Sequence, residues 1–294
     1  MGLFDKCKPL IGVVHLPPLP GSYGYRRRPF PFPRGPRYSI DEIVEYAVNE
    51  AKKYHASGFD AVIVENFGDK PYKQTVGQAE AAAMARVVAE VVKSVPIPVG
   101  VNVLRNSPYT ALVVAHVSGA SFIRVNSLCE TRYAVEGIIT PSMHQLAEAA
   151  RELDVYDDIL TGKIEVIADI NVKHSYPVHA QGTDYNLVVK DCIERSGIPL
   201  AGMIITSPST GVAPDVKYVE DMSNIIRSHH VPVIIGSGVK PENIARYWRL
   251  VDGFIVGTSV KLGEMTENVV QMERAQRLAQ LVKRYREVWP CSSR

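Results

Sequence analysis

Eight short runs of apolar, mostly β-branched residues recur along this chain, and each run ends at a turn signal. They are Leu10–Leu16, Ala61–Val64, Pro98–Leu104, Phe122–Val125, Ile164–Ile170, Gly202–Thr206, Pro232–Ile235 and Gly253–Val256. Runs of this length and composition are typical of buried parallel strands. Their starts are 21 to 51 residues apart, so every interval can hold a crossover helix.

The intervals also carry the residues that begin and end helices. Two boxes of the Ser/Thr-x-x-Glu/Gln type, Ser39 with Glu42 and Thr75 with Gln78, predict helix starts. Further starts and stops are predicted at Ser107-Pro108, Asp184, Pro241, Gly58, Gly119 and Gly197. Strand and helix therefore alternate throughout.

Eight βα units in 294 residues predict a (β/α)8 TIM barrel, with one domain spanning residues 1–294. The alternative is a doubly wound open sheet, which alternates in the same way but more often has a Gly-rich first turn. Here the first run ends in His15-Leu16-Pro17-Pro18, which favours the barrel.

Composition excludes several classes of protein. Hydrophobic residues at 46% and charged residues at 22% are typical of a soluble globular chain. A net charge of +2 argues against nucleic acid as a partner, and no apolar run reaches the roughly 18–20 residues that membrane insertion needs. The four cysteines, Cys7, Cys129, Cys192 and Cys291, are far apart and too few to staple this chain, so we expect a reducing, cytoplasmic location.

Residues 17–38 form a Pro/Arg-rich segment with seven prolines and five arginines, including Arg26, Arg27 and Arg28. It follows the first predicted strand, so in a barrel it would lie at the catalytic mouth. We expect this loop to cover the pocket or to join subunits into a homo-oligomer. The alternative is a solvated, tolerated insertion.

Polar residues gather at the carboxyl ends of the first five predicted strands, where the active site of a barrel lies. The candidate catalytic residues are His15, Glu65, Asn102, Arg124, Asn126, Asp169, Lys173 and His174. Asp169, Asn171 and Lys173 are spaced two residues apart, so their side chains should project to the same side of a strand. Asp169 or Glu65 would be the base, and Lys173 or His174 the acid or electrostatic stabiliser. The alternative is a structural ion pair of Arg124 with Asp169 or Glu65.

Two small, polar turns end the last two predicted strands. The residues expected to bind phosphate are Gly236, Ser237, Gly238, Gly257, Thr258 and Ser259, because barrels bind phosphate with the loops after strands 7 and 8. The alternative is that the glycines serve only to fit the backbone into tight turns and bind no phosphate. No dinucleotide or Walker motif occurs, and no cofactor is predicted. A divalent metal is possible on His15, Glu65, Asp69, Asp169 and His174, although they lack a metal-ligand spacing.

Several longer motifs, in order, resemble the BtpA/SgcQ family over nearly the whole chain. They are GVVHLP from Gly12, DAVIVENFGD from Asp60, GVNVLRN from Gly100, FIRVN from Phe122, VKHS from Val172, GSGV from Gly236 and VGTS from Val256. The resemblance implies a phosphate-binding TIM barrel. Relatives in that family include a photosystem I biogenesis factor and a protein encoded among sugar-utilisation genes.

We therefore expect an enzyme that acts on a small phosphorylated sugar or phosphoribosyl compound by acid–base chemistry, of isomerase, epimerase or lyase type. The alternative is a non-catalytic assembly factor for a membrane complex, as in photosystem I biogenesis.

Overall fold

The computed structural model describes residues 2–26, 38–178, 183–207 and 210–291. Eight parallel strands form a closed barrel in the order β1-β2-β3-β4-β7-β9-β10-β11, with β11 pairing back to β1. Their bounds are β1 (Leu10–His15), β2 (Ala61–Glu65), β3 (Val99–Asn102), β4 (Phe122–Val125), β7 (Glu165–Ile170), β9 (Gly202–Ile205), β10 (Val233–Ile235) and β11 (Gly253–Val256). Each strand overlaps one of the eight predicted runs, so the predicted barrel is confirmed.

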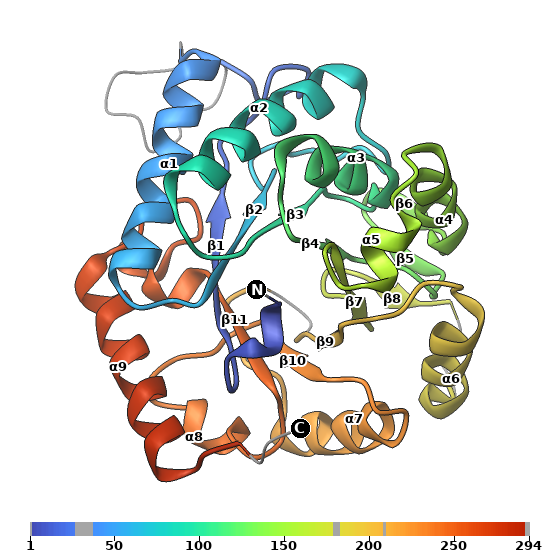
Figure 1. Ribbon diagram of the computed structural model, residues 1–294, viewed down its shortest axis with the longest axis vertical. Helices are drawn as coiled ribbons and strands as arrows, with labels where there is room; N and C mark the ends of the chain where they lie inside the picture. The colour runs from blue at the N-terminus through green and yellow to red at the C-terminus, as the bar shows by residue number, and fades with distance from the viewer. Residues whose placement is uncertain (1, 27–37, 179–182, 208–209, 292–294) are drawn as a thin grey trace.

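Helices surround the barrel on its outside (Figure 1). They are α1 (Ile40–Ala56), α2 (Gln78–Ser94), α3 (Pro108–Ser118), α4 (Met143–Glu152), α5 (Tyr156–Leu160), α6 (Tyr185–Arg195), α7 (Val216–Ser228), α8 (Ile244–Tyr247) and α9 (Met272–Val288). At least one helix follows every barrel strand in sequence. Within the described ranges, none of them is long and apolar enough to cross a membrane.

Three of the predicted helix starts show how local hydrogen bonds set the boundaries. The Ser39–Glu42 capping box is confirmed, since each residue's side chain accepts the other's backbone N–H. The Thr75–Gln78 box is wrong, because the amide of Gly77 donates to Glu80 instead and α2 begins at Gln78. The start at Pro241 is also wrong: the Lys240 amide donates to Asn243 Oδ1 (2.8 Å), which closes a turn before α8.

The barrel lumen is apolar at its amino-terminal end and polar at its carboxyl-terminal end. Inward side chains from the lower parts of the strands form one cluster, and Leu3 of the short helix η1 (Leu3–Asp5) is part of it. Burying each large aliphatic side chain stabilises the fold by about 1.5–3 kcal/mol. The layer above consists of polar groups, each of which needs a partner when it is buried.

A small antiparallel sheet lies outside the barrel strands, in the order β6-β5-β8. Its strands are β5 (Arg132–Ala134), β6 (Gly137–Ile139) and β8 (Tyr176–Pro177). The central strand β5 thus joins the excursion after β4 to the segment that follows β7. The Arg132 guanidinium strengthens this link by donating to Asn171 Oδ1 (2.6 Å) and Ser175 Oγ (3.0 Å).

The four cysteines form two disulfides, Cys7–Cys291 and Cys129–Cys192, with Cα–Cα distances of 5.7 and 5.4 Å. The expectation that the four cysteines are too few and too far apart to crosslink the chain is therefore wrong. Separation along the sequence does not measure separation in a closed barrel, where the first strand lies beside the last.

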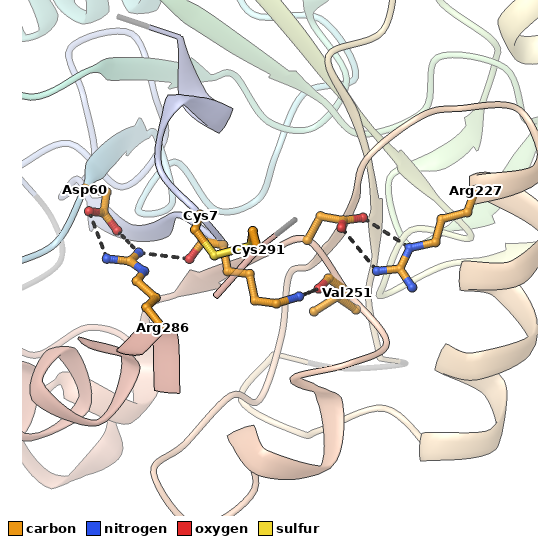
Figure 2. The surroundings of a disulfide bond; sticks show 8 residues. Cys7, Asp60, Arg227, Val251, Arg286 and Cys291 are labelled. Atoms are coloured by element: carbon orange, nitrogen blue, oxygen red, sulfur yellow. Dashed lines mark hydrogen bonds and ion pairs between the residues drawn. A yellow bond between two sulfur atoms is a disulfide. The ribbon is translucent and has the colours of Figure 1, made fainter. Parts of the chain in front are cut away.

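Cys7–Cys291 ties the two ends of the chain together near the amino-terminal end of the barrel (Figure 2). Arg286 of α9 donates to the Lys8 carbonyl (3.0 Å) and forms an ion pair with Asp60. The Lys8 ammonium donates to the Val251 carbonyl (2.5 Å) just before β11. Polar contacts on both sides of the disulfide therefore hold the same ends.

The Pro/Arg-rich segment is described only at its two ends. The Tyr38 hydroxyl donates to the Pro18 carbonyl (3.1 Å) and Arg26 Nε donates to the Tyr38 carbonyl (3.3 Å), so the ends lie close together. Residues 27–37 lie outside the described residues. The predicted cover over the mouth, and the predicted subunit contact, stay predictions.

Candidate active site

Four polar side chains form a continuous row across β1 to β4 at the carboxyl end of the barrel. His15 is in register with Glu65, Glu65 with Asn102, and Asn102 with Arg124. Because residues in register on neighbouring parallel strands point to the same side, these four side chains share the lumen. The predicted gathering of polar strand ends is thus present here as a built layer.

Arg124 is the centre of the layer and is held by two carboxylates. Its Nε and Nη2 atoms donate to the two oxygens of Asp169, each at 2.9 Å. Asn126 Nδ2 donates to the same carboxylate (3.0 Å), so both Asp169 oxygens are occupied. Glu65 Oε2 lies 4.0 Å from Arg124 Nη1. Both Arg124 and Asp169 are buried, and buried charges need the kind of close, bidentate pairing that these two groups make.

Glu65 connects Arg124 to the histidine end of the row. Its Oε2 accepts from Asn102 Nδ2 (2.6 Å), and its Oε1 lies 3.7 Å from His15 Nε2. Burial, followed by the charges of Lys261, Lys173 and Arg124, lowers the pKa of His15 well below its ordinary value. His15 is therefore a neutral imidazole at pH 7, and its approach to Glu65 is not an ion pair.

Lys173 reaches the same region from the segment after β7. Its backbone is fixed on both sides: its N–H donates to Thr206 Oγ1 (3.1 Å), and its carbonyl accepts from Arg105 Nη2 (2.6 Å). Burial, with the neighbouring Arg124 charge second, lowers the pKa of the Lys173 ammonium to about 8. A substantial share of this side chain is therefore a neutral amine near pH 8.

A single cavity of about 400 Å³ joins this layer to the two glycine turns. His15, Glu65, Arg124 and Lys173 line it on one side. All six residues predicted to bind phosphate line it too: Gly236, Ser237, Gly238, Gly257, Thr258 and Ser259. Four of the eight catalytic candidates and all six phosphate candidates, deduced separately from the sequence, thus border one space.

Two of the glycines are required by close approach. A Cβ on Gly257 would lie 2.6 Å from the His15 ring. A Cβ on Gly238, where φ is +66°, would lie 2.2 Å from the backbone of Val212. Within the described residues, no acceptor takes the amide hydrogens of Gly238, Thr258 or Ser259, and backbone amides of this kind are typical donors to an oxyanion.

The cavity also has lining residues that the sequence analysis did not select. The polar and loop residues among them are Thr210, Gly211, Val212, Lys240 and the segment 264–267, and the apolar ones are Val13, Val239, Ile255 and Val256. Lys240 forms an ion pair with Glu264 (2.5 Å), and Lys70 pairs with Glu267 (3.2 Å). Lys240 follows the first glycine turn by two residues, and that position is the signal that could have identified it.

Some predicted site residues lie elsewhere. Asp169 and Asn102 hydrogen-bond to the lining residues Arg124 and Glu65, and Asn126 hydrogen-bonds to Asp169; none of these three lines the cavity itself. His174 is exposed; its Nε2 accepts from the Thr210 amide (3.3 Å), so it holds the 210–212 turn.

The predicted shared face of Asp169, Asn171 and Lys173 is wrong for Asn171. Strand β7 ends at Ile170, and Asn171 has a φ of +53°, which breaks the alternation of side chains. Its side chain instead contacts Arg132 and Tyr218.

The candidate metal ligands are dispersed. Asp69 accepts from the Leu19 amide (2.7 Å) and from Asn66, and it lines a separate cavity of about 280 Å³. Burial raises the pKa of this carboxyl to about 6. In the described part of the chain, no three His, Cys, Asp or Glu side chains gather into a metal-binding group. The divalent metal stays a prediction.

Solved structures with the same architecture are numerous. N-(5'-phosphoribosyl)anthranilate isomerase from Pyrococcus furiosus superposes with a TM-score of 0.52 at 11% identity, covering 94% of this chain and 99% of that one. Tryptophan synthase from M. tuberculosis gives 0.56 at 15% identity, covering 95% and 97%. At such identities the similarity shows the fold alone, which is the TIM barrel.

Sequence relatives are much closer. A Pyrococcus horikoshii protein without an assigned function is 41% identical over 280 residues, covering 95% of this chain and 98% of that protein. The photosystem I biogenesis protein BtpA of Synechocystis is 36% identical over 261 residues, covering 88% and 82%. The model of the BtpA family matches residues 6–284. This chain therefore belongs to the BtpA family.

Proposed function

We propose that this protein is an enzyme that acts on a small phosphorylated sugar or phosphoribosyl compound by acid–base chemistry, of isomerase, epimerase or lyase type. One observation carries the proposal: a single cavity is bordered by amide-rich glycine turns on one side and by Glu65, His15 and Lys173 on the other. An anchor for phosphate beside titratable groups is what such chemistry needs. The similar folds named for phosphorylated substrates, including thiamine phosphate pyrophosphorylase, agree with it.

Each group has a role in the proposed reaction. The turns at Gly236–Gly238 and Gly257–Ser259, with Lys240, hold the phosphate. Glu65 is the base, because it lines the cavity, whereas both oxygens of Asp169 are occupied by Arg124 and Asn126. Asp169 is then a positioning residue for Arg124. Neutral His15 donates to, or accepts from, a substrate hydroxyl.

The test is thermal unfolding with matched ligand pairs. Ribose 5-phosphate, fructose 6-phosphate and inorganic phosphate should raise the melting temperature, whereas ribose and fructose should not. At 100 times Kd the stabilisation is about 2.7 kcal/mol. Equal shifts from both members of each pair, or no shift from any phosphate compound, would contradict the proposal.

A second candidate is a non-catalytic assembly factor for a membrane complex. The name of the Synechocystis relative favours it, as does the apolar surface of the small outer sheet, where Val135 in the β5–β6 turn is 98% exposed and Tyr176 of β8 is 75% exposed. Under this candidate, Val135→Asp would impair assembly of the complex in cells, and Glu65→Gln would not. The enzyme proposal expects the reverse pattern for turnover.

We also propose a cytoplasmic location, where sugar phosphates are held. The two disulfides do not conflict with it, because intracellular proteins of hyperthermophilic archaea are often rich in disulfides, and close relatives come from Pyrococcus. Lysing cells directly into an alkylating agent, which blocks free thiols, shows whether the two disulfides are present while the protein is inside the cell. A chain recovered only outside the cell membrane would contradict it.

A further inference from the structure

We propose that Lys173 is a nucleophile whose amine forms an imine with a carbonyl carbon of the substrate. The substrate class is then narrower than the phosphorylated sugar or phosphoribosyl compound of the proposed function: it is a phosphorylated aldehyde or ketone. This inference rests on the proposed function, because it uses the same cavity and the same phosphate anchor.

The position of Lys173 is the first support. Its backbone is fixed by Thr206 on one side and by Arg105 on the other, and β8 begins only three residues later. The side chain therefore extends from a fixed point into the cavity that the glycine turns border. A ligand anchored by phosphate at those turns would present its other end to Glu65, Arg124 and Lys173.

The absence of a counter-ion is the second support. Within the described ranges, no carboxylate lies within ion-pair distance of Lys173 Nζ, and no hydrogen-bond partner of this atom is present. Of the two carboxylates whose charges act on Lys173, Asp169 is paired with Arg124, whereas Glu65 remains available as the base. A lysine beside a guanidinium and without its own carboxylate is poised to lose its proton.

The electrostatic surroundings agree with this geometry. Burial and Arg124 lower the pKa of Lys173 to about 8, and Arg105 acts in the same direction; Glu65 and Asp169 act in the opposite direction. At pH 8 about half of the side chain is neutral, against well below 1% for an ordinary lysine. The other cavity lysine, Lys240, is paired with Glu264.

The bond changes balance without a further reactant. The neutral amine adds to the carbonyl carbon, and the carbonyl oxygen takes up a proton to become a hydroxyl group. The amine gives up one proton as it adds, which balances the proton that the oxygen takes up. A second proton, drawn from solvent water, then converts the hydroxyl into leaving water while the nitrogen lone pair forms the C=N bond of a protonated imine, and loss of the remaining nitrogen proton to water gives the neutral imine. Glu65 and His15, which line the same cavity, are the groups placed to move these protons.

The experiment traps the imine by reduction. The protein is incubated with dihydroxyacetone phosphate or pyridoxal 5'-phosphate, reduced with borohydride, digested and mapped by mass spectrometry. We expect one dominant adduct at Lys173, at least about tenfold above any other lysine at pH 8 because of its larger neutral fraction, with a yield that rises through about pH 8. Excess inorganic phosphate should suppress it.

Two variants and the dephosphorylated probes make the result decisive. Lys173→Arg should remove the dominant adduct, and Lys217→Arg, at an exposed lysine of α7 that pairs with Asp221 away from the cavity, should leave it. Labelling spread over surface lysines, or unchanged in Lys173→Arg, would overturn the proposal. If inorganic phosphate stabilises the protein but Lys173 stays unlabelled, the imine falls and the phosphate site stands. If dihydroxyacetone and pyridoxal label Lys173 as well as their phosphates do, the lysine stands and the phosphate anchor falls.

Discussion

Glu65 and Asp169 are both buried carboxylates near Arg124, yet their surroundings differ. Asp169 receives three hydrogen bonds from Arg124 and Asn126, whereas Glu65 lies 4.0 Å from the guanidinium and lines the cavity. The first carboxylate compensates a buried charge, and the second remains available to a ligand. Their substitution should therefore separate stability from function.

We expect Asp169→Asn to lower the free energy of unfolding by about 3–5 kcal/mol, because it leaves Arg124 as an uncompensated buried cation. Glu65→Gln should cost no more than about 1.5 kcal/mol, since Arg124 keeps its bidentate partner and Asn102 can still donate to the new amide oxygen. Urea unfolding followed by circular dichroism measures both. Equal losses from the two variants would show that the two carboxylates share the guanidinium.

Gly238→Ala tests the first glycine turn. Its new methyl group would meet the backbone of Val212 at 2.2 Å, so the turn must move and stabilisation by inorganic phosphate should be lost. Gly197→Ala is the matched control: φ is +67° there, but no atom lies within 4 Å of the new Cβ. Because alanine disfavours the left-handed conformation, Gly197→Ala should lower the free energy of unfolding by about 1–2 kcal/mol. The response to phosphate should be kept. A Gly238→Ala variant with an intact phosphate response would exclude this turn from the site.

The sequence could not decide between Asp169 and Glu65 as base, for a physical reason. Both have the same charge and both end barrel strands, and only the direction of the Arg124 guanidinium distinguishes them. Likewise, Asn171 has a positive φ, and its side-chain partners Arg132 and Tyr218 are 39 and 47 residues away in the sequence. Residue type and position along the strands predict which groups lie close together. Which of them hydrogen-bond to each other depends on tertiary contacts that the sequence does not show.

At the scale of elements, prediction was most accurate where one local interaction dominates. Barrel strands follow from β-branched runs that are buried on both faces, and α1 follows from its own capping box. The Thr75–Gln78 box failed because Glu80, inside the same turn, competes for the exposed amide of Gly77. The outer sheet was missed because its strands are two or three residues long and because β8 pairs with β5 from 43 to 45 residues away.

The disulfide Cys129–Cys192 belongs to this scale, because it joins the loop after β4 to α6 and closes a loop of 63 residues. Replacing both cysteines with serine should lower the free energy of unfolding by about 2–4 kcal/mol. Urea unfolding of the variant, with Cys7–Cys291 intact, measures the loss. Adding a reductant to the wild type should cost more than this, since it opens both disulfides. A double variant as stable as the wild type would show that this crosslink is dispensable.

At the scale of the whole molecule, the barrel closes where β1 meets β11, and the chain ends meet at the same seam. Arg286, Asp60 and Lys8 connect α9, β2 and β11 to the first strand, and Cys7–Cys291 adds a covalent bond across 284 residues of sequence. A closed barrel needs every strand, so the strand order could be predicted from eight runs. The disulfides could not, because four cysteines allow three pairings and the unpaired state as well.

The backbone and the disulfide together make residues 7–291 a covalent ring. A single peptide-bond cleavage anywhere between Cys7 and Cys291 opens that ring without releasing a fragment, and the cut protein is in effect a circular permutant whose former ends are joined through sulfur. Such a nicked molecule would run as one species on a gel without reductant and as two pieces with it. The barrel therefore has no end from which unravelling can start while that bond is intact.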